Sequence, residues 1–316
     1  MVIKMDRVKE YEALVEVYEK EGLDTSLFGD RVAAIIISGD RILGLNNVEG
    51  VEIRGEEMEN GVKARVKISD NVELPFPIHL CTGFLKSEGY QRVVFDISLG
   101  RNSKVKFLSH CIFPYARDFT HDAYAKIRVG EGSTVIYEDE HVHGEGVRMR
   151  SKTDVVVGKG GRYTGKFSLI RHRARELRLE MNAELEDHAV CELVSKVKAV
   201  KDDSVETKEV AYLNGKSSRA NLKTIVIAFD SARANVINEV HGLGDYARGH
   251  VECREIVKGD ADVQTIPILR VKNERAELTH EASIGRINEA QLNQLMAKGL
   301  TEEEAADLII KGLLRE

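Results

Sequence analysis

The sequence predicts a mainly β protein: a right-handed parallel β-helix, which is a solenoid of two facing sheets, with a short N-terminal helix and a C-terminal helical cap. Three observations predict this fold. Turn residues recur every 28 to 30 residues, each repeat holds two strand-like segments, and no repeat leaves room for a crossover helix. The expected parts are an N-terminal helical segment (residues 1–30), a β-helix core (residues 31–270) and a C-terminal helical domain (residues 271–316).

The first expected element is a helix over Asp6–Glu21. Apolar and aromatic residues recur in it at helical spacing, with charged residues between them. They are Val8, Tyr11, Val15 and Tyr18. Gly22 is expected to end the helix, because glycine is favoured just after a helix C-terminus.

The central part of the chain repeats. One turn residue per repeat falls at Asp40, Asp70, Gly100, Gly130, Gly158, Glu186, Asn214 and Gly242. From Gly100 to Asn214 the residue before the turn and the residue two positions earlier are apolar, as in Leu99 and Ile97. These two columns have strand parity and are expected to face one interior. An antiparallel β-sandwich is the alternative that this pattern leaves open.

Composition disfavours several classes of protein. The chain has 316 residues, of which 42% are hydrophobic and 31% charged, as in a folded domain. Its net charge of −6 disfavours nucleic-acid binding, and its longest apolar run, Val32–Ile37, is too short to cross a membrane. Four widely spaced cysteines without a CxxC pair indicate a reducing compartment, so we expect a cytoplasmic protein.

Two helices are expected at the C-terminus. Residues 288–298 carry leucines at helical spacing, and Gly299 follows as a stop signal. Thr301 and Glu304 have the spacing of a capping box, which would open the second helix. The apolar residues expected to pack within or beneath this pair are Leu292, Leu295, Leu308 and Ile309.

Counting eleven residues past each turn residue gives a mainly apolar column that is expected to face the interior. It consists of Cys81, Cys111, His141, Leu169, Val197, Ile225 and Cys253. Because stacked rungs lie about 4.8 Å apart, Cys253 would lie roughly 24 Å from Cys111. Cys81, Cys111 and Cys191 are therefore either small buried hydrophobic residues or residues with a chemical role.

The last full repeat carries polar side chains that can bind metals. Glu239 and His241 are read as occupying the two columns that are apolar in earlier repeats, and His250, Cys253 and His280–Glu281 follow. Thiolate, imidazole and carboxylate groups are ligands for iron or zinc. Burying them is costly unless they are paired or ligate something. This end of the solenoid is therefore expected to hold a metal or cluster site, or else to be a solvent-exposed rim.

The C-terminal third contains specific motifs. They are Ala247–Cys253 (ARGHVEC), Leu278–Gly285 (LTHEASIG), Met296–Leu300 (MAKGL) and Ile309–Gly312 (IIKG). Together they closely resemble the shared C-terminal core of SufB and SufD, the scaffold subunits of the SUF iron–sulfur cluster assembly system. The resemblance is strongest over Arg248–Leu314, and the weaker repeat pattern extends it back through the β-helix.

The resemblance implies that the chain is a scaffold and not an enzyme. Family members dimerise through the end of the β-helix and bind the ABC-type ATPase SufC through the C-terminal helices. They build a transient iron–sulfur cluster at the subunit interface, so a sulfur donor and apo-protein acceptors are further partners. ATP hydrolysis would belong to SufC, because Phe167 stands where a phosphate-binding loop after Gly160–Lys166 needs Ser or Thr.

By the same resemblance, Cys253 matches the cluster-building cysteine of SufB, Glu281 its essential glutamate, and His280 the histidine that SufD contributes across the interface. The chain carries all three, so it resembles a compact SufB-like form that could work as a homodimer, with a SufB/SufD-like heterodimer as the other arrangement. In an extended segment His280 and Glu281 point to opposite faces. We therefore expect Cys253 and Glu281 of one chain and His280 of the other to ligate one iron.

Further residues are expected to support this site. His250, Glu239 and His241 would be supporting or alternative ligands, and Cys111 or Cys191 would accept sulfur upstream in the interior column. The competing interpretation is a non-catalytic β-solenoid interaction module that only docks the ATPase. A β-helix acting on carbohydrate is disfavoured, because no sheet shows an exposed row of carboxylates and aromatic residues.

Overall fold

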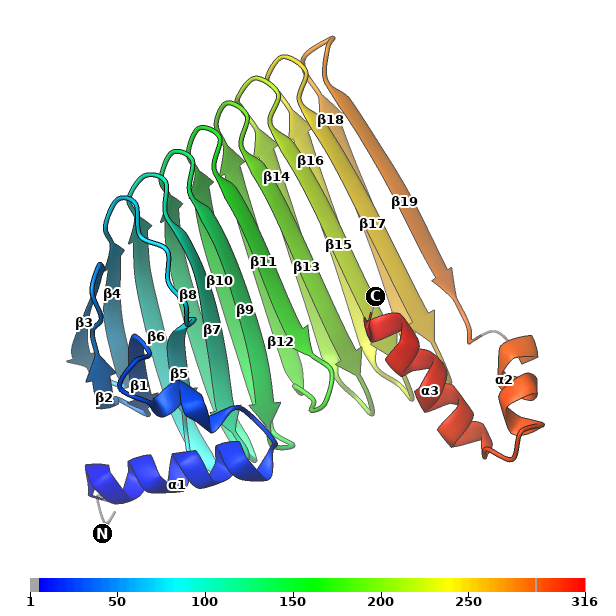
Figure 1. Cartoon of the computed structure of the whole chain (residues 1–316). Coiled ribbons are helices and arrows are strands. Elements are labelled where there is room, and N and C mark those ends of the chain that lie inside the picture. Colours follow the sequence, from blue (N-terminus) through cyan, green and yellow to red (C-terminus); the bar gives the residue numbers. More distant parts are fainter. Residues whose placement is uncertain (1–5, 288, 316) are drawn as a thin grey trace.

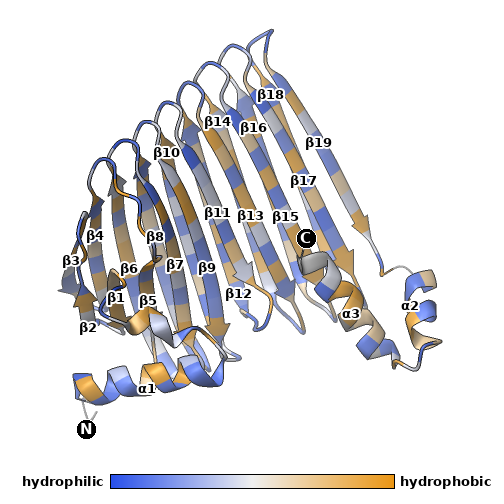
Figure 2. Ribbon diagram, viewed as in Figure 1, coloured by the Kyte–Doolittle hydropathy of each residue, from blue (hydrophilic) through white to orange (hydrophobic). Residues whose placement is uncertain are grey.

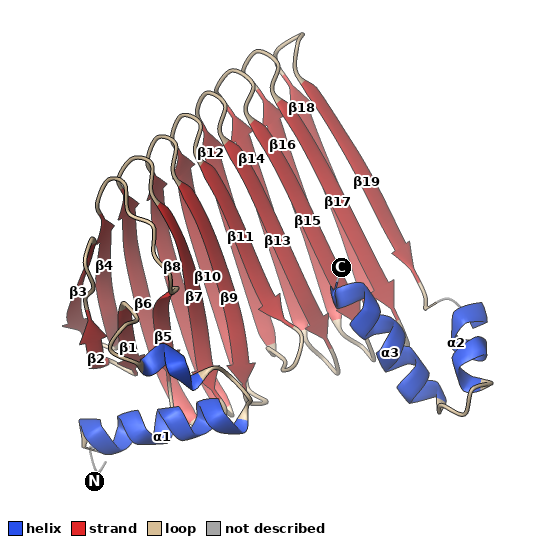
Figure 3. Cartoon of the chain, in the orientation of Figure 1, coloured by secondary structure: helices blue, strands red, loops and turns tan. Residues whose placement is uncertain are grey.

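A computed structural model describes residues 6–287 and 289–315, and its central part is a solenoid of two parallel sheets. Figures 1 and 3 show the strands stacked rung upon rung, with helices beside both ends. A short N-terminal helix precedes the strands and two helices follow them. The predicted fold class is therefore confirmed.

Within the described residues, sheet A has ten strands and sheet B has nine. In spatial order, sheet A contains β19 (Glu277–Gly285), β17 (Arg248–Val257), β15 (Arg219–Ala228), β13 (Val190–Ala199), β11 (Arg162–Leu169), β9 (Thr134–His143), β7 (Lys104–Phe113), β5 (Ile78–Gly83), β1 (Ala34–Ser38) and β2 (Arg41–Asn46). Sheet B contains β18 (Asp262–Val271), β16 (Arg233–Gly242), β14 (Ser204–Leu213), β12 (Glu176–Leu185), β10 (Val147–Val157), β8 (Asp118–Val129), β6 (Glu88–Leu99), β4 (Gly61–Ile68) and β3 (Val51–Met58).

The repeat read from the sequence is the rung of this solenoid. Parallel partners lie one repeat apart along the chain, as in Ile97↔Ile127, Val155↔Ala183 and Ala211↔Val240. Successive strands of one sheet are therefore separated by a strand of the other sheet. The turns repeat a left-handed backbone conformation, with φ values of 56°, 66°, 63° and 58° at Asn102, Gly132, Gly160 and His188. Glycine and asparagine adopt this conformation at low cost.

Aliphatic side chains fill the space between the sheets. Figure 2 shows hydrophobic and hydrophilic residues alternating along the strands, which is the pattern of strands with one buried face. The predicted interior column is present and buried, and it consists of Ile97, Ile127, Val155, Ala183 and Ala211. Burying such a column contributes about 25 cal/mol for each Å² of apolar surface removed from water.

The interior columns shift by one residue at the last repeat, so the prediction that Glu239 and His241 occupy them was wrong. The rung from β14 to β16 is one residue longer than the rung from β12 to β14, so Ala211 pairs with Val240 and Leu213 with Gly242. Val240 and Gly242, and not Glu239 and His241, therefore continue the two interior columns. One extra residue in a rung moves every following side chain to the other face of the sheet.

The column that contains the cysteines also differs from the one predicted by counting eleven residues past each turn. Cys111 pairs with Thr82, whereas Cys81 pairs with His110 on the outer face of sheet A. At the other end Cys253 pairs with Thr224. Thr224 pairs with Ser195, and Ser195 in turn pairs with Phe167. Cys111 and Cys253 both face the interior, but they stand in two different columns.

The N-terminal end of the solenoid departs from the parallel rungs. The first strands pair as antiparallel hairpins, β1 with β2 and β3 with β4. Helix α1 (Arg7–Lys20) lies within the expected range Asp6–Glu21, and a 3-10 helix (Thr25–Phe28) comes next. Leu14, Val17 and Tyr18 of α1 pack against the outer face of sheet A, where Ile36 and Cys81 lie.

Two helices, α2 (Glu289–Met296) and α3 (Glu302–Arg315), lie beside the last strands (Figure 1). The capping box is confirmed: the Thr301 N–H donates to Glu304 Oε2 at 2.8 Å, and the Glu304 N–H donates to Thr301 Oγ1 at 3.2 Å. Ile310 packs with isoleucines of β15 and β17 on the outer face of sheet A. The expectation that Leu308 is covered was wrong, because it lies off this buried stripe and is 50% exposed.

The C-terminal end of the solenoid is open. The last strand, β19, comes after residue 270, where the C-terminal helical domain was expected to begin. It continues sheet A, with Ala282 beside Cys253. His280 and Glu281 therefore lie in a strand and not at the start of the helical cap. Nearly every residue of β19 is exposed, and among the described residues no strand pairs with its free edge. An uncovered edge of this kind is a template for pairing with another chain.

Candidate functional site

Cys253 lies inside the last rungs of the solenoid. It stands on β17, one strand from the open edge, and its side chain is buried between the two sheets. The Cys253 thiol donates to Asn238 Oδ1 on β16 at 3.3 Å. Burial raises the pKa of Cys253 to about 11, and the Thr265 hydroxyl opposes part of that rise. The group is therefore a protonated thiol in the free protein, and a bound metal would have to displace its proton.

A second acidic group, Glu255, lies two residues further along the same strand. Strand parity places it on the interior face with Cys253, and its residue is 1% exposed. Among the described residues, neither carboxyl oxygen of Glu255 makes a hydrogen bond of ordinary geometry, although the Thr265 hydroxyl lies close enough to lower its pKa. Burial raises its pKa to about 7. Glu255 was not predicted as a site residue, although its position two residues after Cys253 on a strand was a signal that the two side chains share a face.

A buried polar chain continues from Cys253 into the interior. The amide nitrogen Nδ2 of Asn238 donates to Glu209 Oε2 at 2.9 Å, and the Ser195 hydroxyl donates to the other Glu209 oxygen. Thr224 also bonds to Asn238, with Nδ2 donating to the Thr224 hydroxyl at 3.0 Å. Burial raises the pKa of Glu209 to about 8. Because the turn spacing predicts this rung one residue too short, it assigns Asn238 to the wrong face, and this chain was not predicted.

His280 and Glu281 do lie on opposite faces of sheet A, as expected for an extended segment. His280 pairs with Val251 and so faces the interior side, which is also the side of Cys253. Glu281 pairs with Glu252 on the outer side. Both side chains are exposed, because no further rung covers β19. The structure of one chain thus offers Cys253 and His280 from one face and Glu281 from the other.

The three expected supporting ligands are directed elsewhere. Glu239 and His241 pair with each other on the outer face of sheet B, where His241 Nε2 lies 2.8 Å from Glu239 Oε1 and the imidazole stacks on Tyr212. His250 faces the outer side of sheet A and bonds through Nδ1 to the Thr279 hydroxyl at 2.8 Å. None of these three residues shares the interior face of Cys253.

The other three cysteines are buried and make no disulfide. Cys111 and Cys191 belong to the interior core, and Cys81 lies beneath α1. Burial raises the pKa of all three thiols, that of Cys81 to about 12. The charge of Glu209 contributes to the rise at Cys191, which places this thiol near the polar chain that leads to Cys253.

Comparison with known proteins identifies the family. A family model described as the SufBD core domain of SUF system FeS cluster assembly matches residues 86–313. The chain belongs to the SufBD family. It is 73% identical to an iron–sulfur cluster assembly SufBD family protein of Pyrococcus horikoshii, over the whole of this chain and 97% of that protein. A second SufBD family protein, from Methanocaldococcus jannaschii, is 32% identical over 89% of each chain.

Membership of the SufBD family confirms the resemblance that the C-terminal motifs suggested. A third relative, from Archaeoglobus fulgidus, is 25% identical over 87% of this chain and 73% of its own length. The SufBD match begins at residue 86, so it covers most of the solenoid and both C-terminal helices. In the described part of the chain, no helix combines the length and apolarity that crossing a bilayer requires. The protein is thus a SufBD family component of iron–sulfur cluster assembly.

The buried carboxyl of Glu209 predicts a pH-dependent stability. Its folded-state pKa of about 8 lies above the usual 4.5, so the folded state holds this proton more tightly than the unfolded chain does. The free energy of unfolding should therefore fall as pH rises from about 4.5 to about 8, by at most about 1.4 kcal/mol per pH unit. Glu209→Gln should remove the part of this fall that Glu209 contributes, while Glu255, with its pKa of about 7, keeps its own part. Denaturation of both proteins at about pH 5, 7 and 9 checks it, and parallel stability curves would contradict it.

Proposed function

We propose that the protein is a scaffold subunit that builds a transient iron–sulfur cluster at a dimer interface, together with an ABC-type ATPase. In this proposal the chain is not an enzyme, and the partner hydrolyses ATP. One observation carries it: Cys253 is a buried thiol one strand away from an open, unpaired sheet edge. A second copy docking on that edge would enclose the thiol and bring its own β19 to it.

The ligands proposed for the nascent cluster are Cys253, Glu281 and His280. Cys253 supplies a thiolate once iron displaces its proton, and Glu281 supplies a hard oxygen that suits incoming ferrous iron. His280 and Glu281 face opposite sides of β19, so one chain cannot readily direct both at one iron. Cys253 faces the same side as His280, so we propose that Cys253 and His280 of one chain act with Glu281 of the other, which reverses the division expected from the sequence. His250, Glu239 and His241 are alternative ligands on the outer faces.

Mixed ligands suit a scaffold. A mixture of sulfur, nitrogen and oxygen donors holds iron less tightly than four thiolates do. Weaker binding favours release of the cluster to an apo-protein. The buried carboxyl of Glu255 can receive the proton that Cys253 loses, because both groups face the interior of the same strand and the pKa of Glu255 is about 7. The same strand thus provides both the ligand and a proton acceptor.

The ATPase is proposed to bind the two C-terminal helices. Helix α3 is held on sheet A by Ile310, which leaves its other side free for a partner. Two apolar side chains on the pair are exposed without cover, Met296 at 39% and Leu308 at 50%. Exposed apolar side chains on two neighbouring helices favour a protein-binding surface. Their uncovered position, which was not predicted, thus supports a docking role beyond that of a cap.

The experiment that tests the scaffold function is anaerobic addition of ferrous iron and sulfide to the purified protein. The scaffold should turn brown and show sulfur-to-iron charge-transfer absorption, and light scattering should find a dimer. A module that only docks the ATPase would stay colourless under the same conditions. A colourless monomer, with the ATPase present, would contradict the proposal.

Sulfur is proposed to reach Cys253 through the interior, with Cys191 or Cys111 as the upstream acceptor. Cys191 lies near Glu209, whose hydrogen bonds lead through Asn238 to Cys253. A Cys111→Ala, Cys191→Ala double variant should therefore form little cluster when a protein persulfide supplies the sulfur, and a normal amount when inorganic sulfide does. A normal yield from the persulfide donor would contradict this route.

A further inference from the structure

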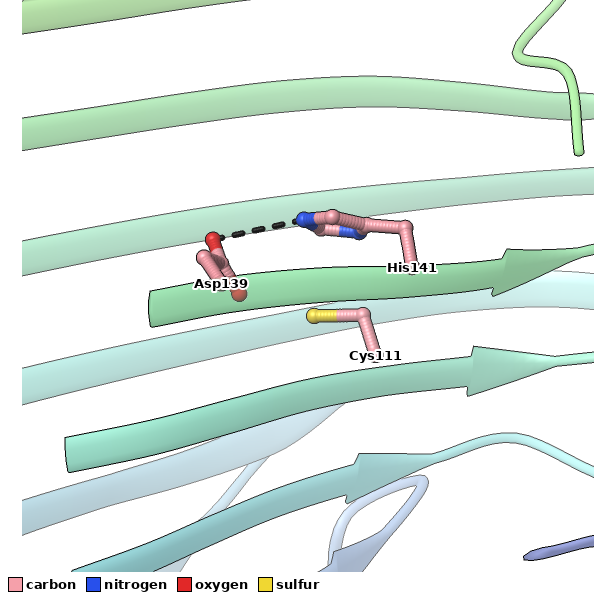
Figure 4. Close-up of side chains that lie close together, drawn as sticks. All are labelled: Cys111, Asp139 and His141. Atoms are coloured by element: carbon pink, nitrogen blue, oxygen red, sulfur yellow. Dashed lines mark ion pairs between the residues drawn. The ribbon is translucent and has the colours of Figure 1, made fainter. Parts of the chain in front are cut away.

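A second cluster of polar side chains lies inside the solenoid, far from Cys253. Cys111 on β7 and Asp139 and His141 on β9 project side by side into the space between the sheets (Figure 4). His121 on β8 faces them from sheet B. Three strands of sheet A, β11, β13 and β15, separate this cluster from β17. The cluster is therefore distinct from the proposed assembly site.

The ligand-forming atoms of the cluster are close together. His141 Nε2 lies 3.3 Å from Asp139 Oδ2, and Cys111 Sγ lies 3.8 Å from His121 Nε2. One ligand atom each of Cys111, Asp139 and His141 lies within 4.8 Å of the other two. In a tetrahedral zinc site, ligands at about 2.0 to 2.3 Å from the metal lie about 3.3 to 3.6 Å from one another. The separations of 3.3 Å between His141 and Asp139 and 3.8 Å between Cys111 and His121 are near these values.

Polar atoms of the cluster are buried without a partner. The imidazoles of His121 and His141 are almost fully buried. Among the described residues, His141 Nε2 and Asp139 Oδ1 make no hydrogen bond. A buried polar atom without a partner costs about 1 to 3 kcal/mol, so two of them in one place call for a missing partner.

The hydrogen bonds behind His141 orient its ring. His143 Nδ1 lies 3.2 Å from the backbone carbonyl of Arg173, which only accepts, so His143 Nδ1 donates to it. His143 Nε2 lies 3.2 Å from His141 Nδ1, which can donate to it. This contact turns His141 Nε2 toward Asp139, and a cation between them would join the imidazole nitrogen to the carboxylate.

The cluster borders an internal cavity of about 20 Å³, which Cys111, His121 and Asp139 help to line. That volume is enough for one water molecule or one ion. We propose that Cys111, His121, Asp139 and His141 bind one divalent transition-metal ion, zinc or ferrous iron, inside the solenoid. This mixture of sulfur, nitrogen and oxygen ligands suits both metals. The ion joins sheet A to sheet B, and its ligation of Cys111 leaves Cys191 as the sulfur acceptor.

Cobalt binding tests the site without depending on cluster assembly. The full chain carrying Cys253→Ser, stripped of metal with a chelator, is titrated anaerobically with Co²⁺. We expect one cobalt per chain, with thiolate-to-cobalt charge-transfer and tetrahedral ligand-field bands that added Zn²⁺ removes. Metal analysis of the protein as purified tells zinc from iron. Because this parent lacks Cys253, failure of the proposed assembly site does not affect the result.

Variants in the same Cys253→Ser background locate the ion. Cys111→Ser should lose the thiolate band, Asp139→Asn should weaken binding, and His143→Gln, which disturbs only the orientation of His141, should weaken it about 10- to 100-fold. Cys191→Ser, which removes an equally buried thiol, should leave the titration unchanged. Absence of a thiolate band in the folded parent, or its persistence in Cys111→Ser, would overturn the proposal. Unchanged affinity in Asp139→Asn would also overturn it.

Discussion

Replacing Cys253 with serine should abolish cluster formation and leave the solenoid intact. Serine has nearly the same shape as cysteine and can keep the hydrogen bond to Asn238, so the interior packing should survive. Serine supplies no thiolate, so iron and sulfide have no protein sulfur ligand at which cluster assembly can begin. The measurement is iron and sulfide bound per chain after anaerobic reconstitution, with circular dichroism as the check of the fold.

Cys191→Ser is the matched control for this variant. Cys191 is as deeply buried as Cys253 and also lies between the sheets. When inorganic sulfide is supplied, an upstream sulfur acceptor is not needed, so Cys191→Ser should bind a wild-type amount of cluster. A Cys253→Ser protein that assembles and transfers a cluster at the wild-type rate would show that the assigned ligand is wrong.

Deleting residues 288–316 should abolish binding of the ATPase and leave the strands in place. The helices touch the solenoid through a small apolar cluster that includes Ile310 and through an ion pair between Lys258 and Glu302. Their described side chains add nothing to the interior between the sheets. A pull-down with the ATPase, beside a β-rich circular dichroism spectrum, checks the outcome. Retained binding after the deletion would place the docking surface elsewhere.

A point variant makes the same test without removing the helices. Leu308→Glu puts a charge at a half-exposed apolar position and should weaken ATPase binding by about tenfold or more while leaving stability nearly unchanged. Val8→Glu is the control, because Val8 is also exposed and apolar, at 61%, but lies on α1 at the other end. Equal binding by the two variants would contradict docking through Leu308.

The sequence was sufficient to predict the solenoid, because its repeat is a physical period. Each rung must bury two strand faces, so apolar residues return at the same place in every turn, as Ile97, Ile127 and Val155 do. The capping box at Thr301 and Glu304 also followed from local chemistry. The family was predicted from the C-terminal motifs, which no rule of periodicity would supply.

What the sequence did not show depends on single-residue changes in rung length. One extra residue in the rung from β14 to β16 moved Glu239 and His241 to the outer face and brought Asn238 to Cys253. Side-chain direction in a strand reverses with every residue, so a miscount of one reverses the interpretation of a site. The cluster of Cys111 and His121 was missed for another reason: its members come from different sheets, and only the folded chain brings them together.

The claim that one cluster site is shared by two chains is tested most directly with mixed dimers of inactive variants. A Cys253→Ser chain and a Glu281→Ala chain, isolated together through two different tags, should bind about half the wild-type amount of cluster per dimer, because one of two half-sites keeps Cys253, His280 and the Glu281 of its neighbour. A dimer of Cys253→Ser with His280→Ala should bind little. Recovery in this second dimer would assign His280 to the neighbouring chain, and absence of cluster from both mixed dimers would contradict a shared site.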